Sequence, residues 1–239
     1  MFKEEKMSLG APEKKTFIMP NVSNICVTAS DYSEAEKLRA KLDLNEKRGI
    51  LFVGRMDELK GVNYLLEAFA KLVSDRDDIA LICVGDGPFR QRLESLCKAL
   101  HIDDRVHFIW WVDPEIVRNK YIIPYYLSCD VLVVPSIFLR GKPDACPLVV
   151  NEAMGCGKAV IATAAVGSAH AMIKNGVNGF IVPEKDSAAL YAALKAVLAD
   201  PATAEAMGEA SREVVEAGFT YSHMVGGFQR AISSLTDAE

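Results

Sequence analysis

The chain has 239 residues, of which 50% are hydrophobic, and a formal net charge of −5. This length and composition allow one or two domains with a sizeable core, and the mixed charge gives no electrostatic basis for binding nucleic acid. The apolar runs are too short to span a bilayer, and the polar first eight residues lack the apolar region of a secretory signal.

The predicted elements begin weakly and then become regular. Residues 25–28 favour a strand and residues 33–42 a short helix. After them, continuous apolar runs predict strands, and apolar residues at helical spacing predict the helices between them. Strands are predicted at 50–53, 79–84, 106–109, 131–134, 159–162 and 180–182. Helices are predicted after Gly61, around 93–100, over 114–128 with a bend or break at Pro124, after Pro147, near His170, after Asp186, after Asp200 with Pro201 at its first position, and over 221–235.

The order of these elements indicates the fold class. Strands that alternate with helices imply βαβ units and a parallel sheet, and unbroken apolar runs are typical of strands covered on both faces. The sequence therefore predicts an α/β protein with a doubly wound, Rossmann-like parallel sheet over residues 46–218. A stub or linker at 1–45 precedes this domain, and a C-terminal helix at 219–239 follows it.

The stretch from residue 143 to 163 carries two carboxylates around a predicted helix start. Asp144 precedes the helix and Glu152 lies within it, while Pro147 suits the first helical position because its φ is fixed and it has no N–H. Gly155 and Gly157 are expected to end the helix. A helix N-terminus favours phosphate or a polar ligand, but acids are common in first turns, so this spacing alone is weak evidence.

Other polar residues follow the ends of the predicted strands. Arg55 and Lys60 come after the first strand and Gly85 after the second, while Asp144 and Glu152 follow the fourth. In an open parallel sheet, ligands bind in the crevice outside the carboxyl ends of the strands. Two cations and two carboxylates around one crevice suit a ligand with both phosphates and hydroxyls, such as a nucleotide sugar.

Each of these residues also has a plainer interpretation. Arg55 and Lys60 serve equally well as solvated loop charges. Gly85 and Gly87 match only part of a dinucleotide fingerprint, since Arg90 stands in place of the third glycine, and they suit simple turns. His170 fits an exposed helix position as well as it fits a ligand.

The cysteines and histidines show no metal-site pattern. The six cysteines have no CxxC spacing, and no His/Cys/Asp cluster has the spacing of metal ligands, so no metal is expected. Several of the cysteines fall in strand or helix patterns, where a free thiol behaves as a small buried hydrophobe, and this favours a cytoplasmic location. The sequence contains neither a P-loop nor a Gly-x-Ser-x-Gly motif.

Six segments together resemble one enzyme family. They are GRMDELKG (54–61), VGDGP (84–88), DVLVVPS (130–136), PLVVNEAM (147–154), VIAT (160–163) and NGVNGFIV (175–182). In this order they are similar to the C-terminal, donor-binding domain of retaining GT-B glycosyltransferases of the group 1, glycogen-synthase-like family. The resemblance covers residues 48–232 and implies one half of a GT-B fold.

The resemblance implies a role for each candidate residue. Arg55 and Lys60 would bind the donor diphosphate and stabilise the leaving nucleoside diphosphate, Glu152 would hold the ribose hydroxyls, and Asp144 would contact the donor sugar. These four residues would form the catalytic set. Backbone groups at the helix start would orient donor oxygens, so the donor-binding set would also include Gly54, Gly85, Pro147, Leu148 and Val149. The family transfers the sugar with retention and usually needs no metal or other cofactor.

Several positions depart from the pattern of the family. Asp144 stands in place of a glutamate, Trp110 in place of a common glycine, and Asn151 in place of an apolar residue. The usual Gly-Gly and following Glu after Thr163 are replaced by Gly167, Ser168 and Ala171. The family also has an N-terminal acceptor-binding domain, and only a short stub precedes residue 50.

Three functions remain open from the sequence. The first is a hexosyltransferase-type glycosyltransferase component that binds a nucleoside diphosphate sugar, such as a UDP- or GDP-sugar, and lacks its own acceptor domain. An acceptor-domain chain or a homo-oligomer would complete it, and a membrane would be contacted only through the missing domain. The second is a non-catalytic module that binds a nucleotide sugar or a partner protein. The third, a GT-B epimerase or phosphorylase, lacks its defining residues here.

Overall fold

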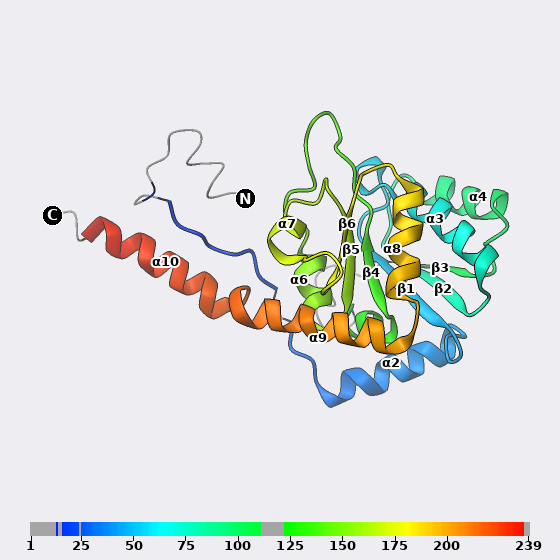
Figure 1. Cartoon of the computed structure of the whole chain (residues 1–239), viewed down its shortest axis with the longest axis horizontal. Coiled ribbons are helices and arrows are strands. Elements are labelled where there is room, and N and C mark those ends of the chain that lie inside the picture. The colour runs from blue at the N-terminus through cyan, green and yellow to red at the C-terminus, as the bar shows by residue number, and fades with distance from the viewer. Residues whose placement is uncertain (1–12, 14–15, 24, 111–121, 237–239) are drawn as a thin grey trace.

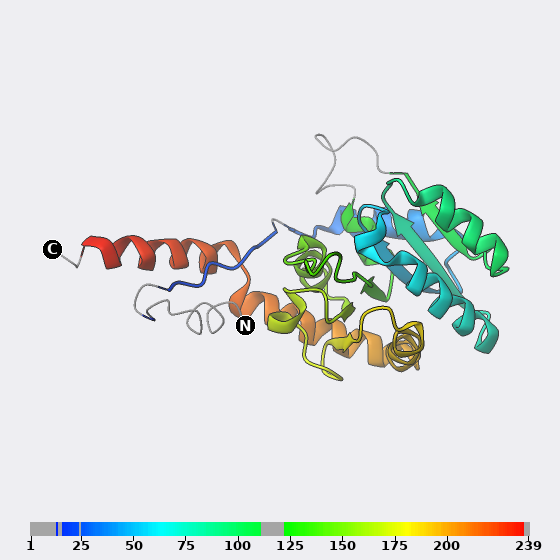
Figure 2. The same ribbon diagram turned by 90° about the horizontal axis from the view of Figure 1, so that it is seen from above.

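The computed structural model describes residues 13, 16–23, 25–110 and 122–236 (Figures 1 and 2). Six strands form one sheet: β1 (Arg48–Val53), β2 (Ile79–Val84), β3 (Val106–Ile109), β4 (Val131–Val134), β5 (Ala159–Thr163) and β6 (Gly179–Val182). The helices are α2 (Ala29–Lys41), the 3-10 turn η2 (Glu58–Lys60), α3 (Val62–Asp75), α4 (Arg90–Ala99), α6 (Leu148–Gly155), α7 (Ala169–Met172), α8 (Ser187–Val197), α9 (Pro201–Gly218) and α10 (Tyr221–Thr236). Residues 122–128 are also helical.

The sheet has the strand order β3-β2-β1-β4-β5-β6, and every pair of neighbours is parallel. The chain moves outward from β1 to β3 and then returns to start the second half at β4. The order therefore reverses between β1 and β4, which is the topological switch point of a doubly wound sheet. The predicted fold class is confirmed, and all six predicted strands are present.

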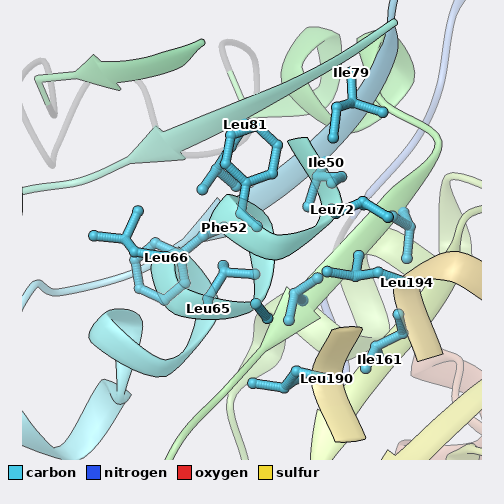
Figure 3. Packing of buried hydrophobic residues seen from close by; sticks show 14 of the residues in the cluster. Ile50, Phe52, Leu65, Leu66, Leu72, Ile79, Leu81, Ile161, Leu190 and Leu194 are labelled. Atoms are coloured by element: carbon cyan, nitrogen blue, oxygen red, sulfur yellow. The ribbon is translucent and has the colours of Figure 1, made fainter. Parts of the chain in front are cut away.

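Two hydrophobic layers cover the two faces of the sheet. On one face, Ile50 and Phe52 of β1 pack with side chains of α3 and α8 (Figure 3), and α4 adds Leu93 and Cys97 to the same cluster. On the other face, Leu51 and Val53 of the same strand pack against α6, α7 and residues 122–129. Because successive side chains of a strand point to opposite faces, a strand covered on both sides must be apolar throughout, which explains the unbroken runs in the sequence.

The helix starts after β6 follow the sequence prediction. The Asp186 carboxylate accepts a hydrogen bond from the Ala189 N–H at 2.8 Å, and the Asp200 carboxylate accepts one from the Thr203 N–H at 2.8 Å. Pro201 is the first residue of α9. Each aspartate satisfies a backbone donor that has no partner within the helix.

Two local predictions need correction. Residues 25–28 form no strand, and α2 begins directly after them. Pro147 precedes α6 as its N-cap, with ψ 122°, so the first helical residue is Leu148. Residues 122–128 are helical, with Pro124 in the first turn of the described part, so the bend or break expected at Pro124 stays a prediction. The part of that helix predicted at 114–121 lies outside the described residues.

Residues 16–23, which we call the N-terminal segment, and α10 project together from the body of the domain (Figures 1 and 2). A Cβ on Gly227 would lie 2.4 Å from the Ile18 carbonyl oxygen, so glycine permits the close approach of the two segments. A stripe of apolar side chains stays exposed along α10, and we call it the α10 stripe. Its members are Tyr221, Val225, Phe228, Ile232 and Leu235. Within the described part of the chain, no helix is both long and apolar enough to cross a membrane.

Candidate functional site

The loop after β1 brings Lys60 to the switch point. It passes through Gly54 at φ 154° into η2, where the Asp57 carboxylate accepts a hydrogen bond from the Lys60 N–H at 3.3 Å. Gly61 follows at φ 59°, and a Cβ there would lie 2.2 Å from the Pro135 carbonyl oxygen. The Ile137 N–H also donates to the Leu59 carbonyl at 2.8 Å. These contacts hold the loop after β1 against the segment that follows β4.

Two glycines after β2 pack directly under that loop. A Cβ on Gly85 would lie 2.0 Å from the Gly54 carbonyl oxygen, and one on Gly87 would lie 2.4 Å from the Met56 carbonyl oxygen. Both residues have a positive φ, which side chains rarely adopt. The glycines therefore serve close backbone approach, in agreement with their interpretation as turn residues.

A pocket of about 660 Å³ opens at the carboxyl ends of β1 and β2. This volume lies within the range of small-molecule sites. Five predicted donor-binding residues line it together, from the loops after β1 and β2 and from α6: Gly54, Arg55, Gly85, Val149 and Glu152. The other lining residues are Val53, Asp86, Gly87, Pro88 and Ile122. The structure thus gathers residues that are far apart in the sequence around one opening.

Arg55 is the exposed cation of this pocket. Its side chain is 69% exposed, and Nε lies 3.3 Å from Asp57 Oδ2. An exposed ion pair of this kind contributes little to stability. The guanidinium can therefore turn toward a ligand at low cost, and its fork of donors suits a diphosphate.

Glu152 lies at the opposite extreme of exposure. It is 4% exposed on α6, and its Oε2 accepts a hydrogen bond from the hydroxyl of fully buried Tyr126 at 2.7 Å. A buried carboxylate is tolerated only when it is hydrogen-bonded. Tyr126 therefore fixes one oxygen of Glu152 in a defined direction at the pocket wall.

Lys60 and Asp144 form an ion pair beside the pocket. Lys60 Nζ lies 2.6 Å from Asp144 Oδ2, and the Ser136 hydroxyl donates to the same oxygen at 2.7 Å. The two charged side chains are only 19% and 12% exposed. Neither residue lines the pocket directly, but a Cβ on Gly54 would lie 3.9 Å from Lys60 Cε, so the stem of the lysine passes next to a pocket residue.

The backbone of Asp144 is held from both sides. Its N–H donates to the Ala165 carbonyl at 3.0 Å, and its own carbonyl accepts from the Gly167 N–H at 3.0 Å. The Thr163 hydroxyl in turn donates to the Ser136 carbonyl. The segment after β5, which departs from the family pattern, therefore positions Asp144.

The start of α6 supplies backbone donors to the same region. Pro147 and Leu148 lie at the first turn without lining the pocket, whereas Val149 lines it. The first N–H groups of a helix have no acceptor within it and carry the positive end of the helix dipole. The loops after β1 and β2 therefore place Arg55 at this pocket, and α6 places Glu152 and backbone N–H groups there.

Asn151 has a structural role that the sequence did not show. It is 4% exposed, its side-chain oxygen accepts from the Ser23 N–H at 3.1 Å, and its amide donates to the Phe219 carbonyl at 3.2 Å. One side chain thus ties the N-terminal segment and the α9–α10 junction to α6. An apolar residue could make neither bond.

Two other positions singled out in the sequence lie away from the pocket. Trp110 is 62% exposed, its ring lies 5.2 Å from the Arg90 guanidinium, and it is not among the pocket-lining residues. His170 is exposed, and its Nε2 lies 3.0 Å from the Ala164 carbonyl oxygen. For His170 the plainer interpretation is therefore confirmed.

The sequence missed two residues that hold the site together. Tyr126 falls in a stretch with weak periodicity, and Ser136 stood in a matched segment without a role of its own. Nothing in the local pattern links Tyr126 to Glu152 or Ser136 to Asp144, because these bonds join different loops and helices.

The cysteines are inert where they are buried. Burial raises the pKa of the Cys97, Cys129 and Cys156 thiols to about 12. Cys83 is buried as well, whereas Cys26 and Cys146 are exposed. Among the residues that the structure describes, no group of three or more His, Cys, Asp or Glu side chains could hold a metal ion.

The fold and the pocket at its switch point define a Rossmann-like domain of the GT-B type. The chain belongs to the group 1 glycosyltransferase family, whose profile, described as glycosyl transferases group 1, matches residues 34–214. It is 31% identical over 202 residues to an uncharacterized glycosyltransferase of Methanocaldococcus jannaschii, covering 83% of this chain and 49% of that protein. It is 32% identical over 242 residues to a D-inositol 3-phosphate glycosyltransferase of Geodermatophilus obscurus, covering 96% of this chain and 48% of that protein.

Solved structures show the same fold. Sucrose-phosphate synthase of Thermosynechococcus elongatus superimposes with a TM-score of 0.76 at 30% identity, over 99% of this chain and 57% of that one. Anabaena HepE, solved in complex with UDP-glucose, superimposes with a TM-score of 0.74 at 22% identity, over 98% of this chain and 61% of that one. The chain thus spans about half the length of the curated relatives it matches.

Proposed function

We propose that this chain is the donor-binding part of a glycosyltransferase and that it binds a nucleoside diphosphate sugar in the 660 Å³ pocket. The observation that carries the proposal is the meeting of exposed Arg55 and buried Glu152 at one pocket on the switch point. The planar guanidinium of Arg55 can donate several hydrogen bonds to a diphosphate, and the fixed carboxylate of Glu152 can accept hydrogen bonds from vicinal hydroxyls. HepE, a protein of the same fold, was solved with UDP-glucose, and this supports a nucleotide sugar as the ligand class.

The proposed roles follow from the chemistry of the reaction. Departure of a nucleoside diphosphate develops negative charge, which cations already in place can stabilise. Arg55 and Lys60 supply that charge and act as catalytic residues, while Glu152 holds the ribose and Asp144 lies toward the sugar. The backbone donors near Pro147, Leu148 and Val149 orient donor oxygens. In this proposal, transfer proceeds with retention, moves a hexose and uses no metal ion.

The acceptor side of the reaction is proposed to come from a separate part. The chain spans about half the length of its relatives. The α10 stripe exposes Val225, Phe228, Ile232 and Leu235 on a helix that projects from the body. An exposed contiguous apolar surface of this kind marks an interaction site. We assign it to an acceptor-binding domain or to a chain that carries one.

The donor proposal is tested by titration calorimetry of the chain with UDP, GDP and ADP. We expect saturable binding of one of them, weakened about tenfold by Arg55→Ala, which corresponds to roughly 1.4 kcal/mol for a charged contact. Arg92→Ala removes an exposed arginine of α4 that does not line this pocket, and it should leave the affinity unchanged. Failure of all three nucleotides to bind would refute the proposal.

A second candidate is a non-catalytic module that binds a partner protein. The exposed α10 stripe favours it, because this surface is as suited to a regulatory partner as to an acceptor domain. The two candidates differ in turnover. Glycosyl transfer from the bound donor, on addition of an acceptor-binding half, supports the enzyme, whereas association without transfer supports the module.

A further inference from the structure

We propose that Asp144 is an internal competitor for the donor diphosphate: its carboxylate binds Lys60, and donor binding must draw Lys60 away. This inference rests on the proposed function, because it concerns the same donor site. It assigns to Asp144 a control of donor affinity in addition to the sugar contact that the family resemblance implies.

The first support is the shared oxygen. Asp144 Oδ2 receives both Lys60 Nζ at 2.6 Å and the Ser136 hydroxyl at 2.7 Å. Both charged side chains are less than one-fifth exposed, so the pair is less screened than a surface ion pair. A phosphate that binds Lys60 must therefore displace the Asp144 carboxylate from the ammonium group or share the ammonium group with it.

The second support is the difference in freedom between the two partners. The backbone of Asp144 is tied to Ala165 and Gly167 on the loop after β5, and its side chain is tied to Ser136. Lys60 has a four-carbon stem with a rotatable ammonium. The lysine is therefore the partner that moves, and the carboxylate stays where it is.

The third support is the path that Lys60 would take. Its Cε lies beside Gly54, 3.9 Å from the place of a Cβ, and Gly54 and Arg55 line the pocket. Because the lysine stem passes next to a pocket-lining residue, rotation about its flexible bonds can carry the ammonium toward the pocket. When Lys60 leaves, Asp144 keeps its charge near the diphosphate and repels it, so the carboxylate opposes binding in two ways.

The test is the nucleotide affinity of Asp144→Asn, which removes the charge and keeps the shape. With the nucleoside diphosphate that the unsubstituted chain binds among UDP, GDP and ADP, we expect binding roughly threefold to tenfold tighter, the effect of one partly buried charge pair. The matching nucleoside, which carries no phosphate, should bind equally to both chains. In Lys60→Ala, the added Asp144→Asn substitution should improve affinity by a smaller factor, because the competition for the ammonium is gone.

Asp130→Asn is the matched control. Asp130 pairs with Arg48 Nε at 2.9 Å, and the Arg48 and Asp130 side chains are 13% and 24% exposed. This pair lies at the amino ends of β1 and β4, opposite the pocket. Asp130→Asn breaks this ion pair, so it should lower thermal stability without changing nucleotide affinity. Unfolding curves of each variant establish that loss of binding does not reflect loss of fold.

Two outcomes would overturn this inference and leave the proposed function intact. If the unsubstituted chain binds a nucleoside diphosphate and Asp144→Asn leaves that affinity equal or weaker, Asp144 does not compete for Lys60. If Asp144→Asn increases the affinity for the nucleoside as much as the affinity for the diphosphate, the effect does not involve phosphate. Absence of nucleotide binding by the unsubstituted chain would instead refute the proposed function, and the inference with it.

Discussion

Replacing Tyr126 by phenylalanine separates the role of Glu152 in the fold from its role in the pocket. The hydroxyl of Tyr126 donates to Glu152 Oε2 at 2.7 Å, and the two residues are 0% and 4% exposed. Phenylalanine keeps the ring and so leaves no cavity of the kind that large-to-small substitutions create. The substitution therefore removes the hydroxyl that donates to the Glu152 carboxylate and keeps the ring in the core.

The size of the effect follows from that bond. A hydrogen bond to a charged group contributes about 1.5–3 kcal/mol. For a domain of this size, such a loss lowers the melting temperature by roughly 4–10 °C. In the pocket, a carboxylate that is no longer held in one direction should bind ribose hydroxyls more weakly, and we expect about a tenfold loss of affinity for the bound nucleoside diphosphate.

The assay compares that nucleotide with its 2′,3′-dideoxy form. Tyr126→Phe should lower the affinity for the ribonucleotide and leave the affinity for the dideoxynucleotide unchanged. Only the ribonucleotide has ribose hydroxyls for Glu152 to bind. The adjacent Tyr125 is half-buried and does not line the pocket, so Tyr125→Phe is the matched control, and it should not discriminate between the two ligands. Equal losses for both nucleotides, or unchanged melting with unchanged affinity, would refute the assignment of Tyr126 as the positioning residue of Glu152.

Three further perturbations test the site and its frame. Gly85→Ala places a Cβ 2.0 Å from the Gly54 carbonyl oxygen at φ 139°, so urea unfolding should show a loss of about 3 kcal/mol or more, against about 1 kcal/mol for Gly176→Ala, where no atom lies within 4 Å. Nucleotide affinity should be the same before and after treatment with EDTA, and a loss that magnesium restores would contradict the metal-free proposal. Burial, with a smaller effect of Lys47, lowers the pKa of His107 below 6.5. Because the unfolded chain then binds more protons below that pH, stability should fall as the pH drops from 6.5, and His107→Gln should flatten this dependence in urea titrations at pH 7 and pH 5.

The strands were predictable because each is a short apolar run that the fold covers on both faces. Val131–Val134 is buried at every position, as a run of four apolar residues in the middle of a parallel sheet should be. Residues 25–28 have similar local character, but they join neither edge of the sheet and lie near α6 instead, where Ile25 and Cys26 share a small pocket with Asn151. Local propensity does not distinguish an extended segment that pairs from one that packs against a helix.

The candidate site was predictable in part for a related reason. A rule of topology gathers the carboxyl ends of parallel strands, so the order of the strands along the chain was enough to place Arg55, Gly85 and Glu152 at one edge. The partners of the charged residues were not predictable. Lys60 and Asp144 are 84 positions apart, and Tyr126 and Glu152 are 26 apart. Their bonds depend on which loops touch, and the glycines at 54, 61 and 85 decide that through their backbone contacts.

The two carboxylates of the site are held in ways that suit different tasks. Glu152 is buried and accepts a hydrogen bond from fully buried Tyr126, so its direction is set before any ligand arrives. Asp144 is bonded to a flexible cation, so the charge around it changes when that cation moves. If both assignments hold, the nucleoside part of the donor binds to a surface formed in advance, whereas the diphosphate part binds by exchanging one anion for another. Affinity for a nucleoside should then depend little on ionic strength, and affinity for its diphosphate should fall as salt rises, because only the second involves charged groups on both sides.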